Sequence, residues 1–179
     1  MQLDRVLFLP AGAPPHKLDR PLTPGRTRAD LVELAIAGHP AFSLDRRELQ
    51  RTGPSYTVLT LSELTREQPG TDLFFLAGAD SLSEFLTWKD PAQILSLATL
   101  VVVNRGSVAP PSLDPLRAAL GPQVDQRVQF VQMPGIEISS RDLRHRVSLG
   151  ESIRYLTPRS VEMVIAQKEL YRGNPSAGK

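Results

Sequence analysis

Cysteine is absent from this chain of 179 residues. Its absence excludes disulfide scaffolds, thiolate zinc sites, iron–sulfur clusters and cysteine nucleophiles. Histidine is scarce as well, and the three that occur, His16, His39 and His145, are too scattered along the chain to indicate a metal site. We therefore expect no metal ion held by protein ligands.

Long apolar runs are also lacking, and none approaches the length of a membrane span. The opening residues 5–13 imitate a signal peptide, but their apolar run, Val6–Leu9, ends at Pro10 and is too short for one. The net charge is only +2, without the dense basic stripe typical of nucleic-acid-binding proteins. We expect a cytoplasmic protein that binds neither membranes nor nucleic acid.

The composition is that of a globular domain. Hydrophobic residues make up 41% and charged residues 22%, which is ordinary for a soluble protein. The 16 prolines argue against a coiled coil or a helical bundle. We expect a single domain over residues 1–171 and a flexible tail over residues 172–179.

Short apolar runs alternate with helical patterns along the chain. This alternation predicts an α/β fold with a Rossmann-like parallel sheet and helices on both faces. Strands are expected at residues 6–9, 42–44, 73–77, 100–103 and 128–131. Helices are expected at residues 24–37 after a Thr23 cap, 55–68, 113–120, 140–149 and 158–171. In such a fold the functional loops lie at the carboxyl ends of the strands.

Two of these loops carry residues that could bind a nucleotide. Gly78 and Asp80 follow the strand at 73–77, where glycine admits a ligand to the backbone and a carboxylate can accept from a ribose hydroxyl. Ser139 and Ser140 open a helix that carries Arg144, so N–H groups and a guanidinium could face phosphate oxygens. Plain helix caps with solvated arginines explain both segments about as well.

Further candidates lie in other loops. Arg105 follows the strand at 100–103, at the same expected edge of the sheet. His16 and Lys17 follow the first strand and could clamp a phosphate, although such a pair is more often solvated. Tyr56 and Thr57 open a helix. Trp88 could stack on an aromatic ring, although a lone tryptophan more commonly packs in a core.

The order of these motifs is more specific than any one of them. They are Val6–Gly12, Pro14–Lys17, Gly53–Thr57, Gly78–Asp80, Thr87–Lys89, Val101–Arg105, Ile138–Arg144, Arg154–Leu156 and Pro158. In this combination the chain resembles the bacterial nicotinate-nucleotide adenylyltransferases over nearly its whole length. The resemblance implies a nucleotidyltransferase fold and transfer of AMP from ATP to nicotinate mononucleotide, giving deamido-NAD and pyrophosphate in NAD biosynthesis.

The resemblance also implies roles for the candidate residues. The nicotinate ring would be held by Tyr56, Thr57 and Trp88, and the mononucleotide phosphate would lie near His16 and Lys17. Ribose and nucleotide contacts would come from Gly78 and Asp80. ATP would be bound chiefly through its phosphates by Arg105, Ser139, Ser140 and Arg144, of which Ser140 and Arg144 are the catalytic candidates. Mg²⁺ would be bound mainly through the ATP phosphates, and a homo-oligomer is left open.

The chain departs from the family pattern in two places. The family has threonine after the serine pair, where this chain has Arg141. Family members also open with a strand, a Gly-Gly-x-Phe-Asp-Pro loop and a His-x-Gly-His motif, which this sequence lacks. We therefore expect a longer natural N-terminus and poor solubility or very low activity for the 179-residue chain alone.

Two other functions remain open on the sequence. One is a catalytically dead remnant that binds a mononucleotide. The other is a sister adenylyltransferase, such as one acting on phosphopantetheine. The preference for acid or amide forms of the acceptor is not determined by these residues.

Overall fold

The structure is a computed structural model that describes residues 3–15, 22–105 and 110–173. His16 and Lys17 lie outside the described residues, and so does the side chain of Arg105. The chain forms two compact units, each described by itself below. We call residues 54–136 the central unit, and residues 1–53 with 137–179 the split unit.

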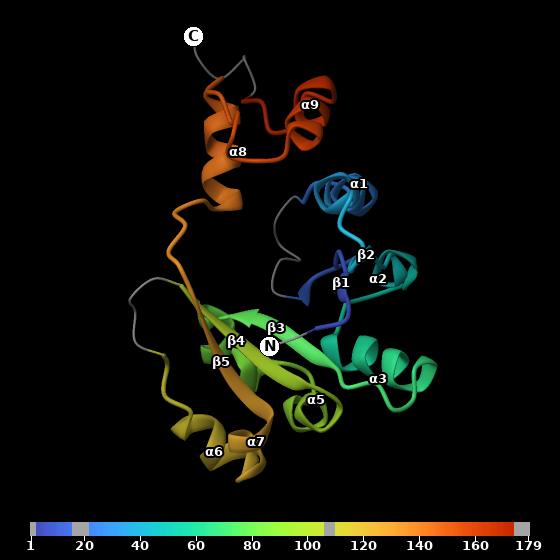
Figure 1. Ribbon diagram of the computed structural model, residues 1–179, viewed down its shortest axis with the longest axis vertical. Helices are drawn as coiled ribbons and strands as arrows, with labels where there is room; N and C mark the ends of the chain where they lie inside the picture. Colours follow the sequence, from blue (N-terminus) through green and yellow to red (C-terminus); the bar gives the residue numbers. More distant parts are fainter. Residues whose placement is uncertain (1–2, 16–21, 106–109, 174–179) are drawn as a thin grey trace. The chain divides into compact units, whose positions relative to one another are not determined.

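The central unit contains a three-stranded parallel sheet (Figure 1). Its strands, in the order β3-β4-β5, are β3 (Phe74–Gly78), β4 (Thr99–Arg105) and β5 (Val128–Met133). The middle strand β4 is buried along Leu100, Val101 and Val102, which are at most 2% exposed. A continuous apolar run fits this position because both faces of a middle strand are covered.

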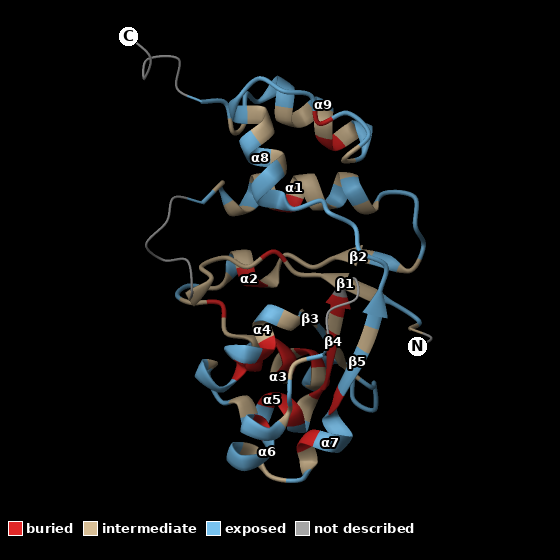
Figure 2. Cartoon of the chain, turned by 90° about the vertical axis from the view of Figure 1, so that its left-hand side faces the viewer, coloured by how far each residue is buried: buried red, intermediate tan, exposed pale blue. Residues whose placement is uncertain are grey.

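Helices complete the central unit. They are α3 (Thr57–Glu67), α4 (Ala79–Ser83), the single-turn 3-10 helix η2 (Phe85–Thr87), α5 (Pro91–Leu97), α6 (Asp114–Leu120) and α7 (Gln123–Arg127). Apolar residues from several of them, including Val58, Ile94 and Val124, form one core with Leu100 and Val102 of β4, and the buried segments of this unit are drawn in red in Figure 2. This core fixes the carboxyl end of β3, where Gly78 and Asp80 lie.

The split unit has a smaller parallel sheet of β1 (Val6–Phe8) and β2 (Phe42–Leu44), joined through α1 (Gly25–Ile36). Its other helices are α2 (Arg47–Gln50), α8 (Ser140–Ser148) and α9 (Arg159–Gln167). Helix α9 packs against α1, where the Ser160 hydroxyl donates to the Leu34 carbonyl at 3.3 Å. Ala29 on α1 is fully buried, so this helix is anchored on its apolar side.

The predicted strands are all found, and α3, α6 and α8 begin and end within two residues of their predicted limits. The cap of α1 is a correction: Pro24 is the N-cap residue, and the Thr23 hydroxyl donates to Tyr171 instead. The end of α9 is a second correction, because the helix ends at Gln167 and not at Tyr171 as predicted. Glu169 and Tyr171 adopt positive φ angles, which a right-handed helix excludes.

The predicted single sheet is found as two sheets, and the single domain over residues 1–171 stays a prediction. Among residues 3–15, 22–105 and 110–173, no helix is long and apolar enough to cross a membrane.

Candidate functional site

The central unit brings Tyr56 and Trp88 into one neighbourhood, although they are far apart in sequence. The Lys89 ammonium lies 4.5 Å from the centre of the Tyr56 ring. Trp88 packs at the edge of the core, with its ring centre 5.7 Å from that of Phe75 and 5.4 Å from that of Phe85. Trp88 remains half-buried, so the core interpretation of this residue is correct only in part.

Thr57 is the first residue of α3, and Tyr56 is its N-cap residue with extended backbone. The core residue Val58 follows directly and fixes the start of the helix. Tyr56 is half-buried and packs on the core through its ring. The phenol and the hydroxyl of Thr57 are thus held at the beginning of a well-anchored helix.

Gly78 and Asp80 lie where β3 passes into α4. Asp80 is exposed in the first turn of α4, and its carboxylate caps no helix, so the plain capping interpretation was wrong for this residue. A Cβ added at Gly78 would meet nothing within 4 Å in the described chain. The glycine therefore leaves open space beside the backbone, next to an available carboxylate.

Helix α8 carries Ser139, Ser140 and Arg144 in the split unit. Ser139 is the N-cap residue, and its hydroxyl oxygen accepts a hydrogen bond from the Asp142 N–H at 3.0 Å. The capping interpretation is confirmed for Ser139, yet its O–H remains able to donate to an anion. Ser140, in the first turn, and Arg144 are both exposed.

The first turn of α8 has chemistry suited to an anion. N–H groups in a first helical turn have no carbonyl partner within their own helix, and the helix dipole favours negative charge there.

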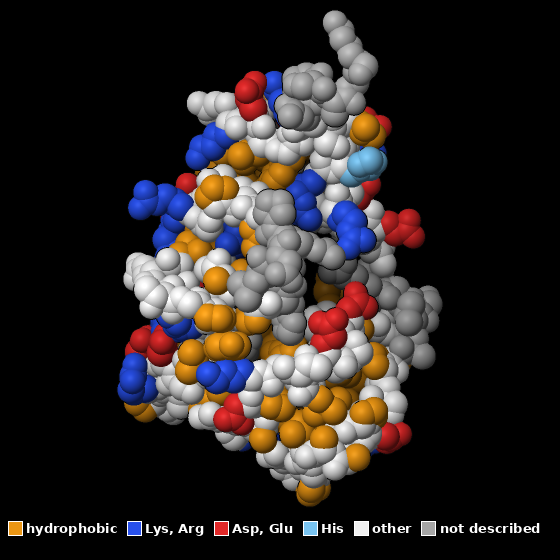
Figure 3. Space-filling view, turned by 180° about the vertical axis from the view of Figure 1, so that it is seen from behind, with side chains coloured by type: hydrophobic (Ala, Val, Ile, Leu, Met, Phe, Trp, Pro, Cys, Tyr) orange, Lys and Arg blue, Asp and Glu red, His pale blue; other side chains and the backbone are white. Residues whose placement is uncertain are grey.

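Most of the chain's 21 lysine and arginine residues belong to the split unit, whereas the central unit has more acidic than basic residues. Figure 3 shows Lys and Arg side chains in several separate places on the face in view, with Asp and Glu side chains among them.

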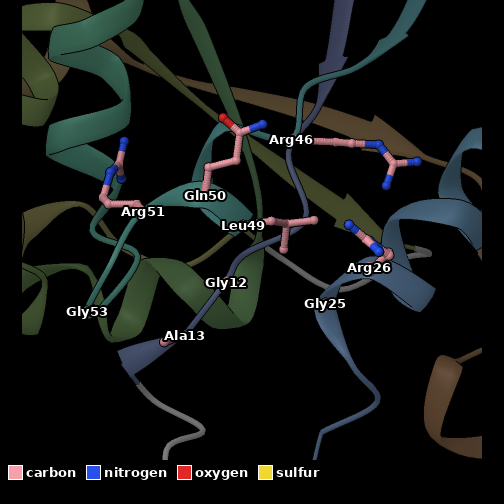
Figure 4. A pocket seen from close by; sticks show the side chains of 9 residues that line it. All are labelled: Gly12, Ala13, Gly25, Arg26, Arg46, Leu49, Gln50, Arg51 and Gly53. Atoms are coloured by element: carbon pink, nitrogen blue, oxygen red, sulfur yellow. The ribbon is translucent and has the colours of Figure 1, made fainter.

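Sequence reasoning missed a cavity of about 420 Å³ in the split unit (Figure 4). It lies where the chain leaves β1 and enters α1, beside α2. The lining residues are Gly12, Ala13, Gly25, Arg26, Arg46, Leu49, Gln50, Arg51 and Gly53. The sequence feature that accompanies this cavity is the series of arginines between β2 and Gly53, which no single motif contains.

Two arginines shape this cavity. The Arg46 guanidinium lies 3.0 Å from Asp30 and 2.9 Å from Glu33, and hydrogen bonds to these carboxylates raise the pKa of Arg46 above its ordinary value. Arg28 donates to the carbonyl oxygens of Ala11 and Thr23. These bonds tie the loop after β1 to the start of α1 and so fix one wall of the cavity.

The site residues expected from the sequence fall in both units. Tyr56, Thr57, Gly78, Asp80 and Trp88 belong to the central unit, whereas Ser139, Ser140 and Arg144 belong to the split unit. Arg105 is the last residue of β4. His16 and Lys17 fall outside the described residues.

Comparison with known proteins gives concordant matches. The model of the cytidylyltransferase-like family matches residues 1–146. A relative from Thermomicrobium roseum is 44% identical over 172 residues, covering 96% of this chain and 79% of the relative. One from a strain of Thermus thermophilus is 44% identical over 170 residues, covering 95% and 84%. Both are named as probable nicotinate-nucleotide adenylyltransferases.

A solved structure matches as well. The Plasmodium falciparum nicotinic acid mononucleotide adenylyltransferase complexed with NaAD superimposes with a TM-score of 0.70. The match covers 96% of this chain and 84% of that one, at 15% identity. This similarity confirms the predicted nucleotidyltransferase fold.

Proposed function

This chain belongs to the cytidylyltransferase-like family and, within it, to the nicotinate-nucleotide adenylyltransferases, and on that premise we propose its reaction and the roles of its residues. The enzyme transfers the AMP moiety of ATP to nicotinate mononucleotide, giving deamido-NAD for NAD biosynthesis. The observation that carries this conclusion is the 44% identity over 96% of the chain.

The chemical step needs no activated side-chain nucleophile. A phosphate oxygen of the mononucleotide forms a bond to the α-phosphorus of ATP, and the bond from that phosphorus to the β-phosphate bridging oxygen breaks. Pyrophosphate leaves with the electron pair of the broken bond. The attacking phosphate monoester, with a second pKa of about 6, is already ionised at neutral pH. The protein therefore contributes alignment and stabilisation of charge.

ATP phosphates are assigned to the start of α8. Ser139, Ser140 and Arg144 offer a helix N-terminus, two hydroxyls and a guanidinium, and the exposure of Ser140 and Arg144 supports this assignment. The family resemblance assigns Arg105, the last residue of β4, to ATP as well. Gly78 and Asp80 would contact ribose, where the open space at Gly78 and the available carboxylate support the role.

The acceptor is assigned to Tyr56, Thr57 and Trp88. Two half-buried aromatic rings, both anchored on the core, suit a flat nicotinate ring, which Trp88 would stack on. Lys89, next to the Tyr56 ring, would lie close to the nicotinate carboxylate.

The mononucleotide phosphate is assigned to the loop after β1, with His16 and Lys17. Gly12 and Ala13 of that loop line the cavity that also contains Arg26, Arg46 and Arg51. Its glycine backbone and the Arg26 guanidinium suit a phosphate ester better than an apolar ligand. The Arg46 guanidinium is already paired with Asp30 and Glu33.

Mg²⁺ would enter with ATP as part of the substrate. Within the described ranges, no group of three or more His, Asp or Glu side chains could hold a metal ion. Mg²⁺ commonly binds through substrate phosphates with few protein ligands. The partners are then small molecules, and the cytoplasmic location remains a prediction.

A competing function is mononucleotide binding without catalysis. The sequence contains no His-x-Gly-His motif, which the resemblance led us to expect. A protein with this function would bind both substrates and release no pyrophosphate.

The test is pyrophosphate release from ATP and nicotinate mononucleotide, using mass-verified chain whose fold is checked by circular dichroism. Release that depends on the mononucleotide supports the transferase. Calorimetric binding of both substrates without release supports the binding protein. Nicotinamide mononucleotide and phosphopantetheine serve as alternative acceptors, and a preference for phosphopantetheine would reassign the acceptor.

A further inference from the structure

The segment after α9 folds back along α8. Glu169 and Tyr171 both have left-handed backbone conformations, with φ of 51° and 64°, which non-glycine residues keep only where their surroundings impose them. Gly173 then approaches α8 so closely that a Cβ there would lie 2.9 Å from the Ser148 carbonyl oxygen. Residues 168–173, the return segment, are therefore fixed against the helix that carries Arg144.

Tyr171 in the return segment lies against Arg144. The Arg144 Cζ is 5.9 Å from the centre of the Tyr171 ring. Arg144 and Ser148 are one helical turn apart, so both contacts of the return segment lie on the same face of α8. The far end of the ring is also held, because the Tyr171 Oη accepts a hydrogen bond from the Thr23 hydroxyl at 3.2 Å.

This contact leaves the Arg144 donors available. An aromatic face attracts a guanidinium through its quadrupole and takes up none of its N–H groups. The Arg144 side chain forms no hydrogen bond or ion pair with any other residue of the described ranges. Arg146 on the same helix differs, since it donates to the Ser152 carbonyl at 3.3 Å and pairs with Glu151 at 3.5 Å.

From these contacts we infer that Tyr171 is a positioning residue for ATP: its ring holds the Arg144 guanidinium in place with all of its donors free for the phosphates. The inference rests on the proposed function, in which Arg144 binds ATP. A side chain that is already confined loses less freedom on binding, so the ring increases affinity without touching the nucleotide.

The test measures the dissociation constant of MgATP by isothermal titration calorimetry on the full chain. The variants are Arg144→Ala, Tyr171→Leu, Tyr171→Phe, Thr23→Val and the double variant of Arg144→Ala with Tyr171→Leu. The matched control is Tyr155→Leu, because Tyr155 makes the same kind of contact with Arg154, at 5.2 Å, outside the proposed ATP site.

We expect Tyr171→Leu to weaken MgATP binding about two- to fivefold. Tyr171→Phe keeps the ring face but loses the hydrogen bond from Thr23, so it should weaken binding less than Tyr171→Leu does and about as much as Thr23→Val. Tyr155→Leu should bind normally. In the Arg144→Ala background, Tyr171→Leu should have no further effect. The NMR resonance of the Arg144 Nε–H group should also shift in Tyr171→Leu without ATP, because the ring current of Tyr171 is lost.

Each contrary result has a distinct meaning. The positioning role is overturned if Tyr171→Leu weakens MgATP binding equally with and without Arg144. It is also overturned if the Arg144 Nε–H resonance does not shift in Tyr171→Leu. Tyr171 is then a structural residue. Unchanged MgATP binding in Arg144→Ala overturns the proposed role of Arg144 and this inference with it. If Tyr171→Leu does not fold, Thr23→Val replaces it in the comparison with and without Arg144. A small loss of MgATP affinity that disappears in the Arg144→Ala background supports the inference. A loss of MgATP affinity that is the same in both backgrounds overturns it.

Discussion

The Lys89 ammonium lies 4.5 Å from the centre of the Tyr56 ring, so a residue that follows η2 reaches the one that caps α3. The pair places a positive charge beside an aromatic surface. A nicotinate ring carries a carboxylate, whereas a nicotinamide ring carries a neutral amide. The pair is thus a candidate source of preference for the acid form of the acceptor.

Replacing this lysine should weaken that preference. Lys89→Gln is expected to lower the ratio of kcat/KM for nicotinate over nicotinamide mononucleotide about two- to fivefold, as for an exposed ion pair. Lys89→Arg should retain it. Because salt screens exposed charges, the difference should narrow at high ionic strength. An unchanged ratio in Lys89→Gln would assign acid recognition to other groups.

Trp88 is the only tryptophan, so its fluorescence reports on one position. Titration with nicotinate mononucleotide should quench the Trp88 fluorescence, because the nicotinate ring stacks on the indole. Ribose 5-phosphate, which lacks the nicotinate ring, should not quench it. Trp88→Ala should cost about 2–3 kcal/mol of stability through lost contacts with Phe75 and Phe85. Trp88→Phe should retain most of the stability, although it removes the only tryptophan and with it the fluorescence signal. If the Trp88 fluorescence does not change when nicotinate mononucleotide is added, the nicotinate ring binds elsewhere.

The strands at residues 6–9, 73–77 and 100–103 were predictable because their sequences are continuous apolar runs. Val101 and Val102 show this best, since both lie in the buried middle strand. Short helices such as α2 (Arg47–Gln50) have too few residues to display a period, and they were not predicted. The end of α9 was missed because apolar residues continue to Tyr171, while the backbone has already turned at Glu169.

The candidate site was predictable only where a residue acts through its local sequence. Ser139 is such a residue, because a cap is formed with the N–H group three positions later. Contacts between distant segments leave no local pattern. Tyr171 meets Arg144 and Thr23, and Lys89 meets Tyr56, through folding alone. The resemblance to a family supplied roles that spacing could not.

The two serines of α8 should separate stability from binding. Ser139→Ala removes the N-cap and should destabilise the protein by about 1 kcal/mol, which denaturant unfolding would measure. Ser140→Ala leaves the cap intact and should keep that stability while raising the KM for ATP. Ser139→Gly should lose only a few tenths of a kcal/mol. Equal stability losses in the two alanine variants would contradict this division.

The pH dependence of stability should include a contribution from Asp114. Hydrogen bonds from Ser112 and then Arg117 lower the pKa of Asp114 below its ordinary 3.8. The carboxylate therefore stabilises the folded state fully above pH 3.8, and this contribution is lost as pH falls through the lower folded value. Arg117→Gln should lower Tm slightly at neutral pH, and the gap should close in acid. A gap that persists at low pH would point to packing of the Arg117 side chain instead of its ion pairs.

Gly78→Ala offers the clearest separation of folding from ligand binding. The backbone at Gly78 has φ of −73°, and a Cβ would meet nothing within 4 Å in the described chain, so alanine fits without strain. Alanine should even stabilise the protein by about 0.4–1 kcal/mol, because the unfolded chain loses freedom. If a nucleotide approaches this backbone, the added methyl group displaces it, and kcat/KM for ATP should fall about tenfold or more. Unchanged kcat/KM together with raised stability would mean that no ligand atom comes within reach of this carbon, and Asp80 would then have to reach the ribose from a greater distance or not at all.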